Sequence, residues 1–377
     1  MRTSPLQGSV IPSQLKDITT LNKLKYYLTS TNYVYYGLSD GTVTNQTSRV
    51  KVVSPANTFG VSALYGNFST TSSGADNITV KASIEINGVL YPLFFSGKRS
   101  AILEPNAILE TDVFNNFFSP GQVFYIRTNV QVITSGKFPI GAALNGDIGE
   151  GYVNGLDYTD SGPIGSTYTY GAYFPLGIKG VGGSVVKSVG IIGDSISVGN
   201  FDPYGHGYLI RGLSPLYGIV NVGNAGENAL GFLSPASYSR IKILENVSHA
   251  IVNYGTNDIT GGLAFAKTNL QLLWNYLSSM GVKVYQCTTT PRTTSTDAWA
   301  TLGNQTSASS ESDRKLLNAW IRSIPAPLSG IFEITDIVES ARDSGLWKAG
   351  YTVDGVHPGT STIYTTIANA IDWSKMA

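Results

Sequence analysis

The sequence has a single cysteine, Cys287, among its 377 residues. One cysteine excludes an internal disulfide and any cysteine-rich metal site. Because Cys287 ends the apolar run Val282–Cys287, we expect a small buried thiol. The chain also has only three histidines, and their spacing fits no metal site.

Charged residues are scarce as well. Asp, Glu, Lys and Arg make up 13% of the chain, about half of the roughly 25% usual for soluble domains. The 25 basic and 25 acidic residues cancel, so no charge pattern indicates a nucleic-acid partner. Thr, Ser, Asn, Gly and 22 Tyr take the place of charges. Such a polar, uncharged surface is common in secreted and virion proteins, and we expect an extracellular or virion-associated protein.

Long apolar runs are missing too. No run approaches the length needed to span a bilayer. The amino terminus, Met1–Pro5, lacks the apolar core of a signal peptide. We therefore expect export by another route, such as phage release, or a leader that has been lost.

The length favours two domains, and the first half of the chain has an all-β pattern. Between residues 25 and 140, segments such as Ile78–Ile86 and Val123–Val130 alternate polar and apolar side chains, as half-buried strands do. Asn87-Gly88 follows the first of these segments and predicts a hairpin. Turn residues recur about every ten positions, which favours a sandwich or jelly roll.

Residues 141 to 185 are rich in Gly, Asp, Tyr and Thr, and predict a long connecting loop that ends near Gly180–Ser184. We assign residues 1–180 to an amino-terminal β-sandwich with this connecting loop, and residues 186–377 to a second domain.

From residue 186 onward, short apolar strands alternate with amphipathic helices. The expected strands are Val189–Ile192, Ile219–Val222, Ala250–Asn253, Val282–Cys287 and Ile331–Ile334. The clearest helices are Leu263–Met280, which stops at Gly281, and residues 310–323. This alternation predicts an α/β domain with a parallel sheet and helices on both faces.

Four polar blocks follow in order along this second half, three of them at the ends of expected strands. They are Gly193-Asp194-Ser195, Asn224-Ala225-Gly226, Gly255-Thr256-Asn257-Asp258 and Asp354-Gly355-Val356-His357. Open α/β sheets place their ligands at the carboxyl ends of the strands. A serine there becomes a nucleophile if a base removes its proton. An Asp three residues before a His can hold the imidazole in one tautomer, and backbone N–H groups or an Asn amide can stabilise an oxyanion.

Each block alone has a simpler explanation. Gly-Asp-Ser is a common turn, and Asn257-Asp258 could cap the following helix. The second block could be ordinary loop, and His357 before Pro358 could be a packed loop histidine. All four together, in this order, indicate acyl transfer.

The blocks resemble those of the SGNH (GDSL-type) hydrolases, whose order is Gly-Asp-Ser, a Gly, Gly-x-Asn-Asp and Asp-x-x-His. The resemblance covers residues 186 to 377 and implies a flavodoxin-like three-layer α/β/α fold. It implies that Ser195 is the nucleophile, His357 the general base and acid, and Asp354 the carboxylate that orients His357. One departure is Ile196, where many members have Leu.

The same resemblance implies an oxyanion hole made by the backbone N–H groups of Ser195 and Gly226 and by the Asn257 side chain. Residues 93–113 are similar to part of secreted SGNH esterases that carry a β-sandwich ahead of the hydrolase, so the first domain is expected to be an accessory module that faces carbohydrate.

Three more residues near the nucleophile are candidates for substrate binding: Asp194, Tyr204 and His206. A structural role is the alternative for His206. No Gly-rich phosphate loop follows the strands, so we expect neither a nucleotide cofactor nor a metal.

The sequence therefore predicts a serine esterase that removes acetyl or other short acyl groups, most readily from a polysaccharide. Two alternatives stay open: a lipase or lysophospholipase, and a virion or cell-surface glycan-binding protein with an inactive hydrolase fold. Retention of Ser195, Asn257, Asp354 and His357 favours an enzyme, since a buried polar constellation without a function only costs stability.

Overall fold

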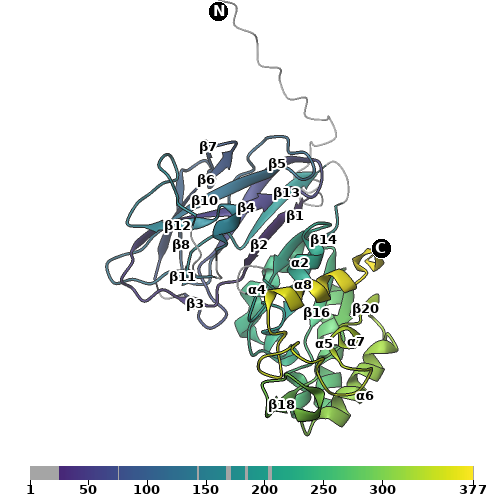
Figure 1. Ribbon diagram of the computed structural model, residues 1–377. Helices are drawn as coiled ribbons and strands as arrows, with labels where there is room; N and C mark the ends of the chain where they lie inside the picture. The colour runs from purple at the N-terminus through teal and green to yellow at the C-terminus, as the bar shows by residue number, and fades with distance from the viewer. Residues whose placement is uncertain are drawn as a thin grey trace, which may run out of the picture.

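The computed structural model describes residues 25–74, 76–141, 144–166, 171–182, 186–202 and 206–376. The first half is built from strands, and the second half wraps helices around a parallel sheet (Figure 1). Within the described residues, no helix is long and apolar enough to cross a membrane.

In the described part of the first half there are thirteen strands and one 3-10 turn. They are β1 (Lys25–Tyr27), β2 (Thr29–Tyr33), β3 (Gly37–Leu38), β4 (Asn45–Val53), β5 (Thr58–Gly66), β6 (Ile78–Ile86), β7 (Val89–Pro92), β8 (Ser100–Leu103), β9 (Ile108–Glu110), β10 (Val123–Gln131), β11 (Pro139–Ile140), η1 (Gly146–Ile148), β12 (Gly151–Asn154) and β13 (Gly177–Gly182).

Two sheets of this half pack face to face. One has the order β1-β13-β5-β9, and the other contains β4, β10, β6 and β7. The Tyr65 hydroxyl on β5 lies 3.0 Å from Thr128 Oγ1 on β10, in a buried contact between the sheets. The predicted hairpin joins β6 to β7, with Asn87 and Gly88 both at positive φ, as its tight turn requires.

The second half alternates strands, helices and short 3-10 turns. They are β14 (Ser188–Gly193), α2 (Gly207–Leu213), β15 (Gly218–Asn221), α3 (Ala229–Phe232), η2 (Pro235–Ser237), α4 (Tyr238–Ile243), η3 (Leu244–Asn246), β16 (His249–Asn253), η4 (Asp258–Gly261), α5 (Leu263–Ser279), β17 (Lys283–Cys287), β18 (Thr293–Ser295), η5 (Leu302–Asn304), β19 (Gln305–Ser307), α6 (Glu311–Arg322), β20 (Gly330–Phe332), α7 (Thr335–Val338), α8 (Ser361–Ala370) and η6 (Trp373–Lys375).

The parallel strands run in the order β15-β14-β16-β17-β20, so the first strand lies between the second and the third. This 2-1-3-4-5 order is that of flavodoxin-like sheets, in which ligands bind at the switch point beside the first strand. Alternate side chains of β14 face opposite layers: Ile191 packs with α2 and α8, and Ile192 with α5. The predicted α/β domain is confirmed, and Cys287 is buried in it as expected.

The two halves share one hydrogen-bonded sheet. Strand β2 pairs in parallel with β15, and antiparallel with β4 at its other edge. The Tyr27 hydroxyl, at the end of β1 just before β2, donates to the Ile243 carbonyl, 2.5 Å away at the end of α4. Gly218 allows the close approach, because a Cβ there would lie 1.5 Å from the Tyr27 carbonyl oxygen. A separate amino-terminal sandwich is therefore not confirmed, and the domain boundary between residues 180 and 186 stays a prediction.

The long connecting loop expected over residues 141–185 is wrong for two segments. β12 pairs with β4, and β13 forms the centre of the smaller sheet between β1 and β5. The glycines of β13 are typical of turns and favoured the loop prediction, but the packing of this strand requires them. A Cβ at Gly177 would meet the Tyr27 ring at 2.5 Å, and one at Gly180 would meet Leu28 at 2.7 Å.

Candidate active site

Ser195 lies in a tight turn directly after the carboxyl end of β14. The Ser197 N–H donates to the Asp194 carbonyl at 3.0 Å, and the Ile196 N–H donates to Asp194 Oδ1 at 3.0 Å. Gly193 permits this turn, because a Cβ there would lie 2.0 Å from Ser197 Oγ. The turn leaves Ser195 half-buried at the edge of the sheet.

His357 and Asp354 come from a turn near the carboxyl end of the chain and meet Ser195. His357 Nε2 lies 2.7 Å from Ser195 Oγ, and His357 Nδ1 lies 2.7 Å from Asp354 Oδ2. Asp354 Oδ1 also accepts from the backbone N–H groups of Val356 and His357, at 2.9 Å each. Partial burial acts to raise the Asp354 pKa, but these hydrogen bonds and the His357 ring outweigh it and lower the pKa. Asp354 is thereby held as the carboxylate that orients the imidazole.

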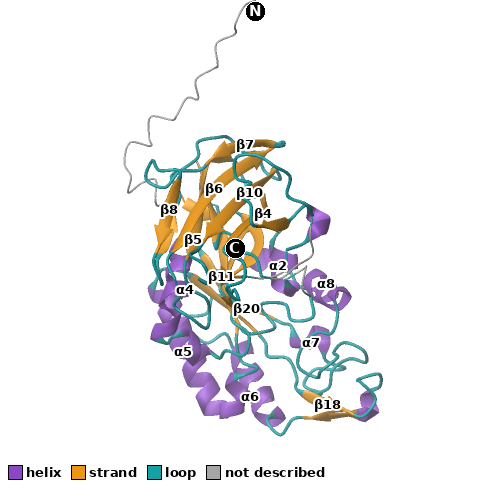
Figure 2. Cartoon of the chain, turned by 90° about the vertical axis from the view of Figure 1, so that its left-hand side faces the viewer, coloured by secondary structure: helices purple, strands orange, loops and turns teal. Residues whose placement is uncertain are grey.

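The turn that carries Asp354 and His357 is fixed at Gly355. Its φ is 76°, and its carbonyl accepts from the Thr293 N–H at 3.0 Å and from Trp347 Nε1 at 3.1 Å. A Cβ at Gly355 would lie 1.9 Å from the Thr293 carbonyl oxygen. Thr293 begins β18, which pairs with β19 at the lower end of the second half in Figure 2, and this backbone contact holds the turn in place.

The segment after the nucleophile places Phe201 beside the histidine. The Phe201 and His357 ring centroids are 5.7 Å apart in an edge-on arrangement, and Phe201 is 48% exposed with a φ of 67°. Asp202 anchors this segment, since its carboxylate accepts two hydrogen bonds from Arg211 at 2.6 Å and one from Ser361 at 2.7 Å.

Asn257 reaches the same edge of the sheet from the end of β16, and two neighbours fix its amide. Nδ2 donates to the Glu227 carbonyl at 2.9 Å, and Oδ1 accepts from Arg292 Nη2 at 3.1 Å. A carbonyl only accepts and a guanidinium only donates, so the amide cannot be reversed. Within the described residues, the second Nδ2 hydrogen has no acceptor.

Gly226 lies beside Asn257 in the exposed loop after β15, at a φ of 80°. Within the described residues, the N–H groups of Gly226 and Ser195 donate to no protein acceptor. Glu227 anchors this loop, because its carboxylate accepts hydrogen bonds from Arg240 Nη1 at 2.9 Å and from the Tyr254 hydroxyl.

The alternative of Asn257-Asp258 as a cap for the following helix is wrong for Asn257, whose side chain makes no capping hydrogen bond there. Asp258 instead links two other segments. It accepts from the Ala229 N–H at the start of α3 at 3.0 Å, and from the Gly255 N–H at 3.1 Å.

Two of the expected substrate-binding residues, Asp194 and His206, are buried. Asp194 is fully buried and His206 is 1% exposed, in a left-handed conformation before α2. Burial lowers the His206 pKa to about 4. The expectation that Asp194 and His206 contact the substrate is therefore corrected, because their burial indicates structural roles. Tyr204 lies outside the described residues.

Arg292 and Glu227 were not anticipated from the sequence. Arg292 follows the expected strand Val282–Cys287 by five residues, a place where an α/β sheet gathers functional side chains. That position was the available signal, but nothing in the sequence connects Arg292 with Asn257. Among the described residues, no group of three His, Cys, Asp or Glu side chains is placed to hold a metal ion.

No protein-family model and no curated protein sequence matches this chain. Solved structures do. A GDSL-like lipase from Bacteroides thetaiotaomicron is 18% identical, over 48% of this chain and 84% of the lipase, with a TM-score of 0.36. An acetylxylan esterase from Geobacillus stearothermophilus is 16% identical, over 49% of this chain and 91% of the esterase, with a TM-score of 0.37.

A third similar structure, from Bacillus subtilis, is 12% identical over 85% of this chain and 78% of its own, with a TM-score of 0.36. The solved structures that this chain resembles thus include GDSL-type proteins and an acetylxylan esterase.

The buried Asp194 makes protein stability depend on pH. Burial raises its pKa from 3.8 to about 7, and the nearby Asp258 adds to the effect. A carboxyl with a raised folded-state pKa stabilises the fold below its unfolded pKa, and this contribution is lost as the pH rises through about 7. We expect the free energy of unfolding of Asp194→Asn to fall less between pH 4 and pH 8 than that of the wild type, by up to about 4 kcal/mol.

Urea titrations at pH 4, 6 and 8 measure this difference, with the exposed Asp147→Asn as the control. Equal pH slopes for Asp194→Asn and the wild type would show that Asp194 is ionised throughout.

Proposed function

We propose that this protein is a serine esterase that works through an acyl-enzyme. The observation that carries the proposal is the continuous chain of contacts from Ser195 Oγ to His357 Nε2, and from His357 Nδ1 to Asp354, at 2.7 Å each. A serine activated in this way needs an ester carbonyl within reach and donors for the developing oxyanion.

In the first half-reaction, His357 Nε2 takes the Ser195 hydroxyl proton while Oγ bonds to the ester carbonyl carbon. The carbonyl oxygen becomes an oxyanion that accepts hydrogen bonds from the N–H groups of Ser195 and Gly226 and from Asn257 Nδ2. As the intermediate collapses, the bond from the carbonyl carbon to the alcohol oxygen breaks, and His357 gives its proton to that oxygen.

In the second half-reaction, water replaces the alcohol. His357 takes a proton from the water, whose oxygen bonds to the acyl carbon. The ester bond to Ser195 Oγ then breaks, and His357 returns the proton to Oγ, which releases the carboxylic acid. Asp354 stays ionised and stabilises the imidazolium in both halves.

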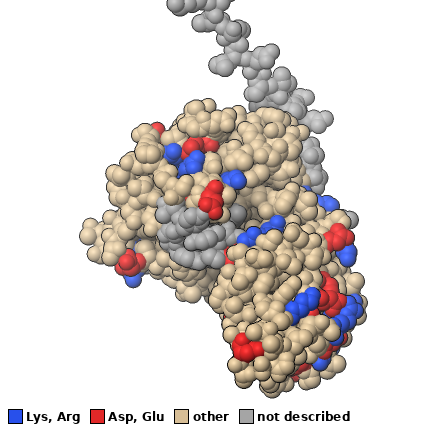
Figure 3. All heavy atoms as spheres, viewed as in Figure 1, with Lys and Arg blue, Asp and Glu red and all other residues tan. Residues whose placement is uncertain are grey.

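We propose a short acyl group, acetyl above all, carried as an O-acetyl ester on a polysaccharide. The Phe201 ring beside His357 supports a small acyl site. The weakly charged surface, visible as the mostly tan face in Figure 3, supports a neutral substrate and an extracellular or virion-associated protein. The proposal includes residues 186–377 as the catalytic domain and residues 1–180 as an accessory β-sandwich module.

Ser195→Ala and His357→Ala are each expected to lower kcat on p-nitrophenyl acetate by about 10⁴-fold or more, because triad members act as a unit. The double variant should be no slower than either single variant. Ser323→Ala, an exposed serine at the end of α6, serves as the control. Wild-type turnover by Ser195→Ala would end the proposal.

Arg292 is a positioning residue for the oxyanion donor. Asn257→Ala should lower kcat by about 10²–10³-fold, and Arg292→Met by about tenfold, with little change in KM for either. In the Asn257→Ala background, Arg292→Met should lower kcat no further, because Arg292 acts by positioning the Asn257 amide.

The control for charge removal is Arg342→Met, whose side chain is 62% exposed. A loss confined to KM would make Arg292 a substrate contact, and additive losses would separate it from Asn257.

Acyl length tests the role of Phe201. Activity on p-nitrophenyl esters should be highest at acetate or propionate and fall towards octanoate. Phe201→Ala should raise butanoate hydrolysis relative to acetate, because removal of the ring leaves room for the longer chain. Phe59→Ala, with a similarly exposed ring on β5, is the control. Wild-type activity that climbs with each methylene, by about fourfold as free burial would give, would contradict a small acyl site.

A further inference from the structure

A groove lies between the two halves of the molecule, and its inner end is lined by residues close to Ser195 and Gly226 in the chain. Its inner section, a cavity of about 440 Å³, lies at the carboxyl ends of β2, β14 and β15. Its outer section, of about 570 Å³, lies between the loop Ser69–Ser73 and α4. Thr70 and Thr71 line both sections, so the two adjoin. Each section has the size of a small-ligand site.

The inner section lies next to the segments that carry the proposed catalytic residues. Asn200 lines it and donates its N–H to the Ser195 carbonyl at 3.1 Å. Ala225 also lines it, and the next residue is Gly226, one of the oxyanion donors. On the opposite wall, the first half contributes Tyr36, which is 41% exposed. A group bound here would be within reach of the ester on which Ser195 acts.

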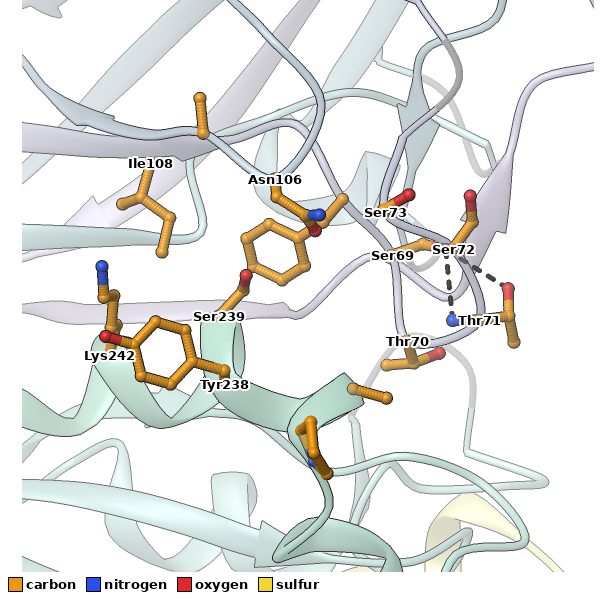
Figure 4. A pocket seen from close by; sticks show the side chains of 14 residues that line it. Ser69, Thr70, Thr71, Ser72, Ser73, Asn106, Ile108, Tyr238, Ser239 and Lys242 are labelled. Carbon is orange, nitrogen blue, oxygen red and sulfur yellow. Dashed lines mark hydrogen bonds between the residues drawn. The ribbon is translucent and has the colours of Figure 1, made fainter.

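The wall from the first half is held in place by its own hydrogen bonds. The Thr70 N–H donates to the Tyr35 carbonyl at 2.9 Å, and the Ser69 N–H donates to the Ser72 carbonyl at 2.7 Å. The Thr71 N–H donates to Ser69 Oγ at 3.3 Å, a bond drawn in Figure 4. The groove is therefore formed before a ligand binds.

The outer section combines hydroxyl groups with an exposed aromatic ring. Figure 4 shows Ser72, Ser73 and Asn106 across from Tyr238 on α4. Tyr238 is 60% exposed, and the Lys242 ammonium lies 4.8 Å from its ring centroid. Among the described residues that line either section, Lys242 carries the only charge.

We infer that this groove binds a neutral polysaccharide chain, whose acyl group it presents to Ser195. The inference rests on the proposed function and names the substrate of the same site. Sugar rings have apolar C–H faces that pack on aromatic rings such as Tyr36 and Tyr238. Their hydroxyls both donate and accept, as the Ser, Thr and Asn side chains of the wall do. The groove fits an anionic polymer poorly, because Lys242 is the one cation among its described lining residues. It fits a lipid chain poorly, because hydroxyl groups line its walls.

The test compares acetylated xylan and acetylated xylo-oligosaccharides of increasing length with p-nitrophenyl acetate. For Tyr238→Ala, the ratio of kcat/KM on acetylated xylan to kcat/KM on p-nitrophenyl acetate should fall about five- to tenfold. The fall should appear only with oligosaccharides long enough to reach α4 from the serine. Tyr276→Ala, an exposed tyrosine on α5 away from the groove, should leave the ratio unchanged.

A binding measurement separates failure of the groove from failure of the esterase. Ser195→Ala, with Tyr238 intact or replaced by Ala, is run on native gels that contain xylan, mannan or dextran. We expect a polysaccharide to retard Ser195→Ala, and the added Tyr238→Ala substitution to abolish this retardation. That result supports the groove whether or not the wild type hydrolyses esters. Equal mobility of the two proteins in all three gels, or an unchanged kinetic ratio for Tyr238→Ala, would overturn the inference.

Discussion

The pairing of β2 with β15 determines how the rest of the molecule is arranged. It adds strands of the first half to the parallel sheet, so the carboxyl end of β2 lies beside those of β15 and β14. Since these strands are parallel, whatever follows β2 must lie at the edge where Ser195 is found. Tyr36 and the loop Ser69–Ser73 thereby line a cavity together with the segments that follow β14 and β15. The first half faces this edge of the sheet because of this one strand pair.

Charged residues hold the Asn257 amide in position. Glu227, fixed by Arg240 and Tyr254, supplies the carbonyl that binds Asn257, and Arg292 binds the other end of the same amide. Removing one partner from such a pair leaves an uncompensated buried charge, which is strongly destabilising. In a chain with few charged residues, several of them are thus committed to the geometry of one amide group.

The surroundings of the three carboxyl groups near Ser195 shift their pKa values in different directions. Hydrogen bonds from the backbone and from His357 lower the pKa of Asp354, whereas burial raises the pKa of Asp194 to about 7 and that of Asp258 to about 6. Asp354 can then stabilise an imidazolium, while Asp194 accepts a hydrogen bond within the turn of Ser195 and Asp258 links the start of α3 to Gly255. In the pairs Asp194-Ser195 and Asn257-Asp258, the aspartate is buried in the fold and its neighbour is the residue proposed to act on the substrate.

The sequence by itself determined the features that depend on local pattern. The apolar runs gave the five parallel strands, the 3.6-residue period gave α5 and α6, and Asn87-Gly88 gave a hairpin. The order of the polar blocks gave Ser195, Asn257, Asp354 and His357 as one group, because the carboxyl ends of parallel strands must meet at one edge.

Only the tertiary structure decided what depends on contacts between distant segments. The glycines of β13 indicate a turn until Tyr27 and Leu28 are seen packed on them. Arg292 has no local mark that joins it to Asn257, 35 residues away. Asp194 adjoins Ser195 in sequence and His206 follows it by eleven residues, yet the fold buries both side chains. A pattern along the chain reports periodicity and order, whereas burial and pairing across the chain are set by which surfaces come together when the sheet is completed.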